Sequence, residues 1–211
     1  MSSTADWKGR CHLIERELKS LLTKEEYDNL CRHPLLAGMK TISHIQMNYY
    51  YDTADLSLKE QDITLRVRQF EDSLTLEIKQ PVEETHAYKA KKEWRFPLES
   101  LPSYIDLGHH FPSLDGHRAM LTFPLLTERR SCHVSDHIRI DLDKSSYLGN
   151  IDYEIEIEFD ENGDSEAADW FHQLLPGKRL QKADGKKTRF FRAYLQTFQG
   201  RKGLSLNEFD L

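Results

Sequence analysis

Residues 151–159 alternate acidic and apolar side chains without a break, and this alternation constrains the fold more than any other stretch of the chain. The acidic members are Glu154, Glu156 and Glu158, and the apolar members are Tyr153, Ile155, Ile157 and Phe159. Side chains on a β-strand alternate between its two faces, so the stretch predicts a strand with a row of carboxylates on one face. Because neighbouring like charges repel, a divalent metal ion between them is the simplest counter-charge. A half-exposed strand with a solvated acidic face is the alternative.

A second acidic strand is predicted near the start of the chain. Residues 13–19 alternate in the same way and place Glu15, Glu17 and Lys19 on one face. A metal site assembled across a sheet needs two acidic strands that are far apart in the sequence. The pair of strands therefore favours a metal site over a solvated face.

Composition indicates a polar interior. Of the 211 residues, only 38% are hydrophobic and 30% are charged, which is polar for a chain with so many predicted strands. We expect a single domain with its core at about residues 11–198 and a flexible tail at residues 200–211. The formal net charge of -6 argues against general nucleic-acid binding, which usually requires a basic excess.

The cysteines and the N-terminal sequence indicate in which cellular compartment the protein is expected. Cys11, Cys31 and Cys132 are odd in number and form no CxxC pair, which suits a reducing environment. The N-terminus lacks the features of a signal peptide, and no apolar run approaches the ~20 residues that span a bilayer. We expect a soluble cytoplasmic protein, a monomer or a homodimer, with no membrane or nucleic-acid partner.

The sequence also predicts helices between and after the predicted strands. Thr23 and Glu26 have the spacing of a capping box at a helix start. Residues 98–107 are predicted to form a short helix, Ser165 to cap a helix that runs to about Leu175, and residues 188–197 to form a final helix. The further predicted strands lie at residues 42–52, 63–68, 74–79, 88–96, 125–132 and 137–143.

The number of strands and their short connections predict a closed, mostly antiparallel β-barrel. Charged faces that point inward explain both the low apolar fraction and the amphipathic helices near both chain ends, which would cover the barrel outside. Arg129 and Arg130 cannot both point inward, and the register of Leu126 and Thr127 favours Arg130. Arginines and lysines suit phosphate oxygens, and carboxylates suit hard divalent cations. The alternative is that the charges only form structural ion pairs, at a cost in desolvation.

These elements resemble a known family. The run Glu15-Arg-Glu-Leu-Lys19 resembles the E-x-E-x-K signature of the CYTH, or triphosphate tunnel metalloenzyme, superfamily. The family's other elements follow in order at Tyr50-Tyr-Asp-Thr53, Leu65-Arg-Val-Arg68, Leu74-Thr-Leu-Glu-Ile-Lys-Gln-Pro81 and Glu154-Ile-Glu-Ile-Glu158. The resemblance extends from Ile14 to about Arg192. It is closest to the bacterial YjbK-type branch at Asn48-Tyr-Tyr-Tyr-Asp-Thr53, Glu84-Thr-His86 and Leu126-Thr127.

The resemblance implies an α+β fold, an eight-stranded antiparallel tunnel with helices outside, that hydrolyses a triphosphate with Mg²⁺ or Mn²⁺. The implied metal ligands are Glu15, Glu17, Asp143, Glu154, Glu156 and Glu158. The implied phosphate-binding residues are Lys19, Arg66, Arg68, Lys79, Arg130, Lys186 (or Lys187) and Arg189. Glu15, Glu17, Lys19, Glu156 and Glu158 are the implied catalytic residues. Inorganic tripolyphosphate is the expected substrate, and thiamine triphosphatase, adenylate cyclase and a non-catalytic phosphate-binding module remain alternatives.

Overall fold

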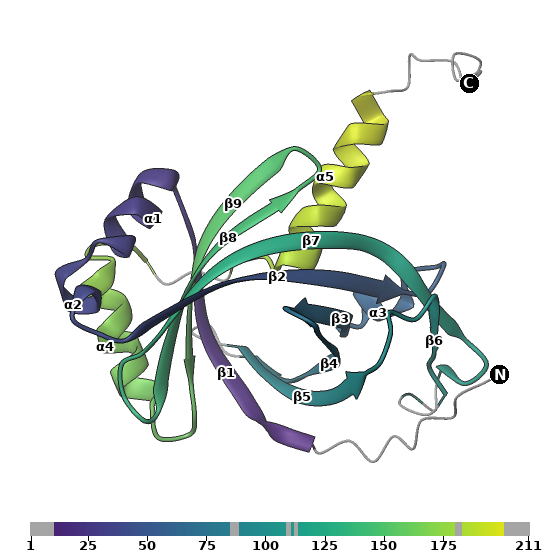
Figure 1. The fold of residues 1–211 in the computed structure, drawn as a ribbon, viewed down its shortest axis with the longest axis horizontal. Helices are drawn as coiled ribbons and strands as arrows, with labels where there is room; N and C mark the ends of the chain where they lie inside the picture. The colour runs from purple at the N-terminus through teal and green to yellow at the C-terminus, as the bar shows by residue number, and fades with distance from the viewer. Residues whose placement is uncertain (1–10, 85–88, 109–110, 112–113, 180–182, 201–211) are drawn as a thin grey trace.

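A computed structural model describes residues 11–84, 89–108, 111, 114–179 and 183–200. Within these residues the chain forms a closed eight-stranded antiparallel β-barrel with five helices (Figure 1). The barrel strands are β1 Cys11–Leu22, β2 Thr41–Asp52, β3 Thr64–Phe70, β4 Ser73–Glu84, β5 Lys89–Leu98, β7 Arg118–His133, β8 Ile138–Tyr147 and β9 Asn150–Phe159. They follow the order β2-β3-β4-β5-β1-β9-β8-β7, and β7 pairs with β2 to close the ring.

The helices are α1 Lys24–Cys31, α2 Pro34–Ala37, α3 Ser57–Glu60, α4 Asp164–Leu174 and α5 Lys186–Gly200. The capping box predicted for α1 is confirmed, because Glu26 N donates to Thr23 Oγ1 at 3.1 Å and Thr23 N donates to Glu26 Oε2 at 2.7 Å. Among the described residues, no helix is long and apolar enough to cross a bilayer.

Strand register places the charged faces inside the barrel. Cross-strand partners include Lys19 with Glu156 and Arg66 with Glu77. The apolar residues between them face outward and are covered. The predicted inward orientation of the charged faces is therefore confirmed, and we call the enclosed interior the lumen.

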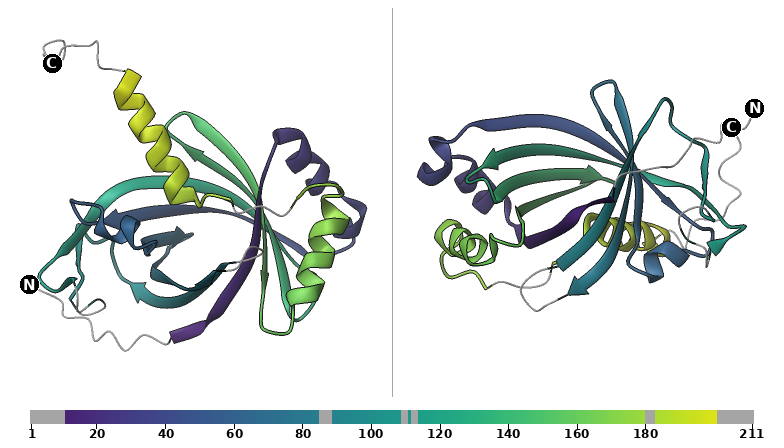
Figure 2. Two further views of the ribbon diagram at one scale, coloured as in Figure 1. Left: turned by 180° about the vertical axis from the view of Figure 1, so that it is seen from behind. Right: turned by 90° about the horizontal axis from the view of Figure 1, so that it is seen from below.

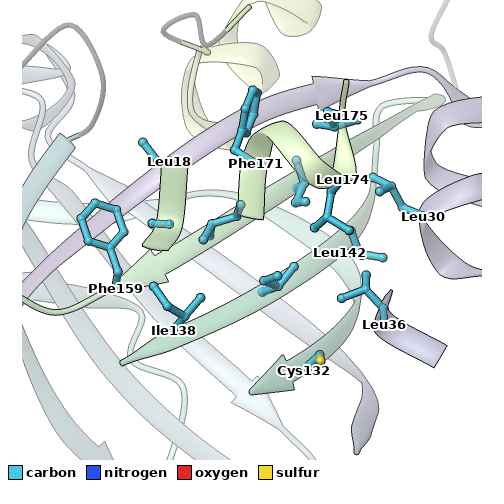
Figure 3. Close-up of a cluster of buried hydrophobic side chains, with 14 of the residues drawn as sticks. Leu18, Leu30, Leu36, Cys132, Ile138, Leu142, Phe159, Phe171, Leu174 and Leu175 are labelled. Atoms are coloured by element: carbon cyan, nitrogen blue, oxygen red, sulfur yellow. The ribbon is translucent and has the colours of Figure 1, made fainter. Parts of the chain in front are cut away.

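Helices α1, α2 and α4 cover the outer faces of β1, β8 and β9. The three helices lie together on one side of the barrel (Figure 1), and their leucines and Phe171 meet the outward side chains of the strands (Figure 3). Phe171 and Ile157 are completely buried. Burying this much apolar surface is a principal source of stability for the fold.

The outer faces of β3 and β4 pack against a different segment. Leu65, Val67 and Leu76 are completely buried there, as is Leu107, and they pack with the buried Ile105. The covering segment includes the short strand β6 Tyr104–Asp106, which pairs with the start of β7. Residues 98–107 were predicted to be a helix, and that prediction is wrong, because β7 offers an unpaired edge that satisfies the β6 backbone.

Helix α5 contacts the inner wall of the barrel, away from α1 and α4 (Figure 2). The ring of Phe190 stacks on Phe123 with centroids 3.5 Å apart, and Phe123 stacks on Tyr50 at 4.7 Å. Tyr50 lies on the inward face of β2, so the first turns of α5 pack against the lumen side of β2 and β7. The helix is longer than the predicted residues 188–197.

Helix α4 and the C-terminal residues bear on two further predictions. Helix α4 begins at Asp164 with Gly163 at the N-cap position and no side-chain cap. The prediction that Ser165 caps this helix is wrong, because that residue already lies in the first turn. The flexible tail was predicted at residues 200–211, but Gly200 belongs to α5. Residues 201–211 lie outside the described residues, as do residues 85–86 of the Glu84-Thr-His86 segment.

Candidate active site in the barrel lumen

The lumen wall divides into two parts of opposite character. The acidic half comprises the inward carboxylates of β1, β8 and β9, namely Glu17, Asp141, Asp143, Glu154, Glu156 and Glu158. The basic half comprises the inward charged side chains of β3, β4 and β5, namely Arg66, Arg68, Glu77, Lys79, Glu93 and Arg95. Each half follows from strand alternation, which gives every second residue to the lumen.

Arg129 on β7 is the central cation of the acidic half. Its Nε and Nη2 donate to the two oxygens of Asp143, each at 2.7 Å, in a bidentate pair. Its Nη1 donates to Asp141 Oδ2 at 2.6 Å, and its Nη2 donates to Glu156 Oε2 at 2.5 Å. One guanidinium therefore links three buried carboxylates on two strands.

Arg130 does not enter the lumen, so the expectation that it faces inward is wrong. Its Nη1 donates to the carbonyl oxygen of Cys31 in α1 at 2.8 Å. Cross-strand pairing explains the difference, because Arg129 lies opposite Asp143 in the register of β7 and β8. Thr127, which is completely buried, shares the inward face with Arg129 and not with Arg130.

Three further cations approach the carboxylates. Lys19 Nζ lies 2.6 Å from Glu156 Oε1 and 3.4 Å from Glu17 Oε1. The other two come from the first turn of α5. Lys186 Nζ contacts Asp143 at 2.7 Å, Glu156 at 3.1 Å and also Glu154. Arg189 Nη2 donates to Glu154 Oε2 at 2.8 Å.

These cations keep Glu156 and Asp143 ionised. Burial raises the pKa of Glu156, but Lys19 and Arg129 outweigh it and lower the pKa well below its usual range. Burial likewise raises the pKa of Asp143, and Arg129 and Lys186 reverse the effect and lower the pKa. Burial lowers the pKa of Lys19, but Glu156 and Glu17 outweigh it and raise the pKa. Glu156 and Asp143 are therefore charged at neutral pH, which is the state that binds a metal ion.

The carboxylates form two overlapping groups that could hold a metal ion. One group contains Asp141, Glu156 and Glu158, the other contains Asp143, Glu154 and Glu156, and within each group the ligand atoms lie within 4.8 Å of one another. Asp141 Oδ1 is buried without a hydrogen-bond partner. A buried carboxylate oxygen without a donor is costly, and hard divalent cations prefer such oxygens. The residues present therefore fit a divalent metal ion.

In the basic half, two carboxylates orient the cations. Arg66 Nε donates to Glu77 Oε2 at 2.8 Å, and Arg68 Nη1 lies 3.2 Å from Glu77 Oε1. Lys79 Nζ lies 3.4 Å from Glu93 Oε2, and Arg95 Nε donates to Glu93 Oε1 at 2.9 Å. Cations outnumber carboxylates among these residues, so this part of the wall carries a net positive charge.

The positive charge excess of the basic half also shifts the pKa values of Glu77 and Arg68. Burial raises the pKa of Glu77, but Arg66, Arg68 and Lys79 outweigh it and lower the pKa to about 2. Burial and the adjacent Arg66 lower the pKa of Arg68 to about 10. Arg68 is therefore charged at neutral pH, yet its positive charge is destabilised by its surroundings. A bound anion would relieve that repulsion.

Asn48 on β2 adds a neutral donor beside this half. It is completely buried, and its Oδ1 accepts a hydrogen bond from Arg68 Nε at 3.2 Å. Its Nδ2 has no hydrogen-bond partner. A buried amide donor next to an arginine suits an anionic oxygen.

The structure brings together most of the residues implied by the resemblance. Glu17, Lys19, Asp143, Glu154, Glu156, Glu158, Lys186 and Arg189 meet in or beside the acidic half, and Arg66, Arg68 and Lys79 meet in the basic half. Lys187 instead lies 3.1 Å from Asp52 Oδ2, apart from both groups of carboxylates that could hold a metal ion. The backbone of Glu15 pairs with Lys91, but its side chain lies outside the described residues.

Sequence reasoning did not assign Arg129, Asp141, Glu77, Glu93 or Asn48 to the site. A signal for Asp141 was present, because it is two residues from Asp143 and alternation puts both on one face. Asn48 had no such signal, since only the structure shows that its amide nitrogen lacks a partner.

Comparison with known proteins identifies the family. The CYTH domain family matches residues 13–191. The chain belongs to the CYTH family. A protein of Bacillus subtilis (strain 168) named "Putative triphosphatase YjbK" is 31% identical over 161 residues, which cover 74% of this chain and 79% of that protein.

Solved structures share this CYTH fold. A Bacillus halodurans protein described as a "putative adenylate cyclase" has a TM-score of 0.65 and 25% identity, covering 85% of this chain and 98% of that one. The Hippeastrum protein HpAC1 has a TM-score of 0.65 and 18% identity, covering 84% of this chain and 95% of that one. HpAC1 supports the fold alone at this identity.

Proposed function

We propose that this CYTH protein is a metal-dependent triphosphatase, which binds a phosphate chain between the two halves of the lumen wall. The observation that carries the proposal is the placement of two buried atoms without a partner. The donor Asn48 Nδ2 lies beside the basic half, and the acceptor Asp141 Oδ1 lies in the acidic half. A phosphate oxygen would satisfy the first and a metal ion the second. The name of the Bacillus subtilis relative supports the same activity.

The acidic half would hold the metal ion. Asp143, Glu154 and Glu156, with Asp141 and Glu158 beside them, provide the carboxylate oxygens that Mg²⁺ and Mn²⁺ prefer. A bound divalent cation would supply charge neutralisation and lower the pKa of a water molecule.

The basic half would hold and orient the phosphate chain. Arg66 and Arg68 present guanidinium groups that Glu77 keeps in place, so little reorganisation is needed when a phosphate binds. In the hydrolysis of tripolyphosphate, the water oxygen forms a bond to the terminal phosphorus and the bond to the bridging oxygen breaks. Orthophosphate and diphosphate leave, and the water's protons pass to phosphate and solvent. Arg66 and Arg68 would stabilise the negative charge that develops on the leaving oxygen.

Inorganic tripolyphosphate is our proposed substrate, because it contains the phosphate chain that both halves would recognise. The test is phosphate release from tripolyphosphate, thiamine triphosphate, ATP and diphosphate, with Mg²⁺, Mn²⁺ or a chelator. We expect metal-dependent release from tripolyphosphate and a loss of at least about 100-fold in Glu156→Gln, because the substitution removes a charge from both carboxylate groups.

Other outcomes would replace this proposal. Formation of cyclic AMP from ATP would instead support an adenylate cyclase, the activity in the name of the Bacillus halodurans protein. Binding of tripolyphosphate without phosphate release, with metal present, would support a phosphate-binding module. Unchanged turnover in Glu156→Gln would contradict the proposed role of the acidic half.

A further inference from the structure

Four inward residues lie directly opposite one another across four neighbouring strands of the barrel. Phe123 on β7 is opposite Tyr50 on β2. Tyr50 is in turn opposite Arg66 on β3, which is opposite Glu77 on β4. Directly opposite side chains on one face of a sheet have Cβ atoms about 5 Å apart. This row therefore places an aromatic pair within contact distance of an ion pair of the basic half.

Helix α5 extends the row with a third aromatic ring. Phe190 stacks on Phe123 with ring centroids 3.5 Å apart and an interplanar angle of 4°, and Phe123 stacks on Tyr50 at 4.7 Å and 19°. All three residues are buried. Because protein interiors are close-packed, rings in such contact cannot move independently of one another. The position of the Tyr50 ring is therefore fixed from the side of α5.

Arg66 is enclosed from two sides. On one side, its Nε donates to Glu77 Oε2 at 2.8 Å, and its Nη2 lies 2.7 Å from the same oxygen. On the other side, the residue opposite it is Tyr50. Glu77 thus directs the guanidinium group, and the buried ring restricts the rotamers that the rest of the arginine side chain can adopt.

Arg68 has different neighbours, although it lies on the same face of β3. The residues opposite it are Asn48 and Thr75, neither of which is aromatic. Its side chain is 19% exposed, compared with 10% for Arg66. Of these two arginines, only Arg66 therefore has an aromatic ring as its direct cross-strand neighbour.

We propose that Tyr50 is a positioning residue, whose ring, supported by Phe123 and Phe190, holds Arg66 in the orientation that binds phosphate. This inference rests on the proposed function, in which Arg66 binds the phosphate chain. An arginine that is already oriented loses little conformational entropy when its ligand binds. Because Phe190 belongs to α5, the docking of this helix acts on the basic half as well as on the acidic half, where its Lys186 contacts Asp143.

The first test compares anion binding with metal binding. Calorimetry would give the dissociation constants of methylene-bridged tripolyphosphate with Mg²⁺ present, and of Mg²⁺ alone. We expect Tyr50→Leu to weaken binding of the tripolyphosphate analogue about tenfold and to leave Mg²⁺ affinity unchanged, because its cross-strand neighbour is in the basic half. Tyr50→Phe keeps the ring and should retain wild-type affinity for both ligands.

Phe190→Leu tests whether the support from α5 matters. It should weaken binding of the tripolyphosphate analogue about threefold, because the Tyr50 ring is loosened but not removed. Phe171→Leu is the matched control. Phe171 is completely buried in α4, on the outside of the barrel, so the same substitution there should lower stability and leave the affinity for the analogue unchanged.

Three results of these titrations would overturn the inference. One is an equal loss of affinity for Mg²⁺ and for the analogue in Tyr50→Leu, because the whole lumen would then be loosened. Another is unchanged affinity for the analogue in that variant. The third is a loss in Tyr50→Phe as large as in Tyr50→Leu, since the hydroxyl group and not the ring would then be responsible.

A second test needs no phosphate ligand, so it separates this inference from the proposed function. Urea denaturation of Phe190→Leu, Arg66→Met and the double variant would show whether the two positions are coupled through the stacked rings. We expect their losses of stability not to be additive, whereas the losses of Phe171→Leu and Arg66→Met should be additive. Additive losses in both comparisons would overturn the positioning of Arg66. A wild-type protein that does not bind the tripolyphosphate analogue would overturn the proposed function, and the urea comparison would still decide whether the rings position Arg66.

Discussion

The acidic and basic halves of the lumen wall arise from the same strand alternation, yet they balance their charges differently. In the acidic half, cations from β1, β7 and α5 converge on a continuous group of carboxylates, with Arg129 at its centre. In the basic half, Glu77 and Glu93 each serve more than one cation, and a positive excess remains. In the acidic half, a metal ion could therefore take the place of one of the side-chain cations. The basic half could instead bind an anion, which would balance its positive excess.

The largest expected effect comes from removing the central cation of the acidic half. Arg129→Met would leave buried Asp141, Asp143 and Glu156 without their shared partner, so we expect the free energy of unfolding to fall by about 3–5 kcal/mol. Urea denaturation would measure the loss. Mg²⁺ should stabilise this variant more than the wild type, because the freed carboxylates gain a new counter-ion.

The adjacent arginine provides the control for this experiment. Arg130→Met loses one hydrogen bond to a backbone carbonyl, so its unfolding free energy should fall by less than about 1.5 kcal/mol. Equal losses in the two variants would show that the acidic half does not depend on Arg129.

The next effect concerns the response of the basic half to pH. The pKa of Glu77 is lowered from 4.5 to about 2, so its stabilising contribution is complete above about pH 4.5 and is lost as the pH falls toward 2. At neutral pH that contribution is about 3 kcal/mol. Denaturation curves for the wild type and Glu77→Gln between pH 7 and pH 2.5 should therefore converge as the pH falls below 4.5. A stability difference that does not change with pH would refute this account of Glu77.

The smallest effect separates ligand binding from stability. Asn48→Asp keeps the oxygen that accepts from Arg68, but it removes the unpartnered donor and adds a negative charge. We expect tripolyphosphate affinity to fall about tenfold, with the unfolding free energy of the ligand-free protein unchanged or increased by the new ion pair. Calorimetry and urea denaturation would measure the two quantities. If affinity is retained, the Asn48 amide does not contact phosphate.

Several features of the fold could be predicted from sequence because they depend on local pattern. Alternation in residues 151–159 predicted the β9 strand and its acidic face, and the Thr23 and Glu26 spacing predicted the start of α1. The β3–β4 hairpin followed from two alternating runs joined by a short turn. The family resemblance that begins at Glu15 then implied a closed barrel of eight antiparallel strands.

Other features depend on partners that are distant in the sequence. A shift of one residue moves a side chain to the opposite face of a strand, and the pairing of Arg129 with Asp143 on β8 decided that this arginine and not Arg130 faces the lumen. Residues 104–106 form a strand because β7 supplies a free edge, although the local sequence resembled a helix.

The sequence by itself determined that charged strand faces line a closed barrel and which residue types they carry. The tertiary structure decided which charges meet, that α5 places Lys186 among the carboxylates, and that Asn48 Nδ2 and Asp141 Oδ1 remain without partners. The physical reason is that strand alternation is a local property of the backbone. Hydrogen-bond satisfaction is a property of every group that surrounds an atom, and those groups come from strands and helices far apart in the chain.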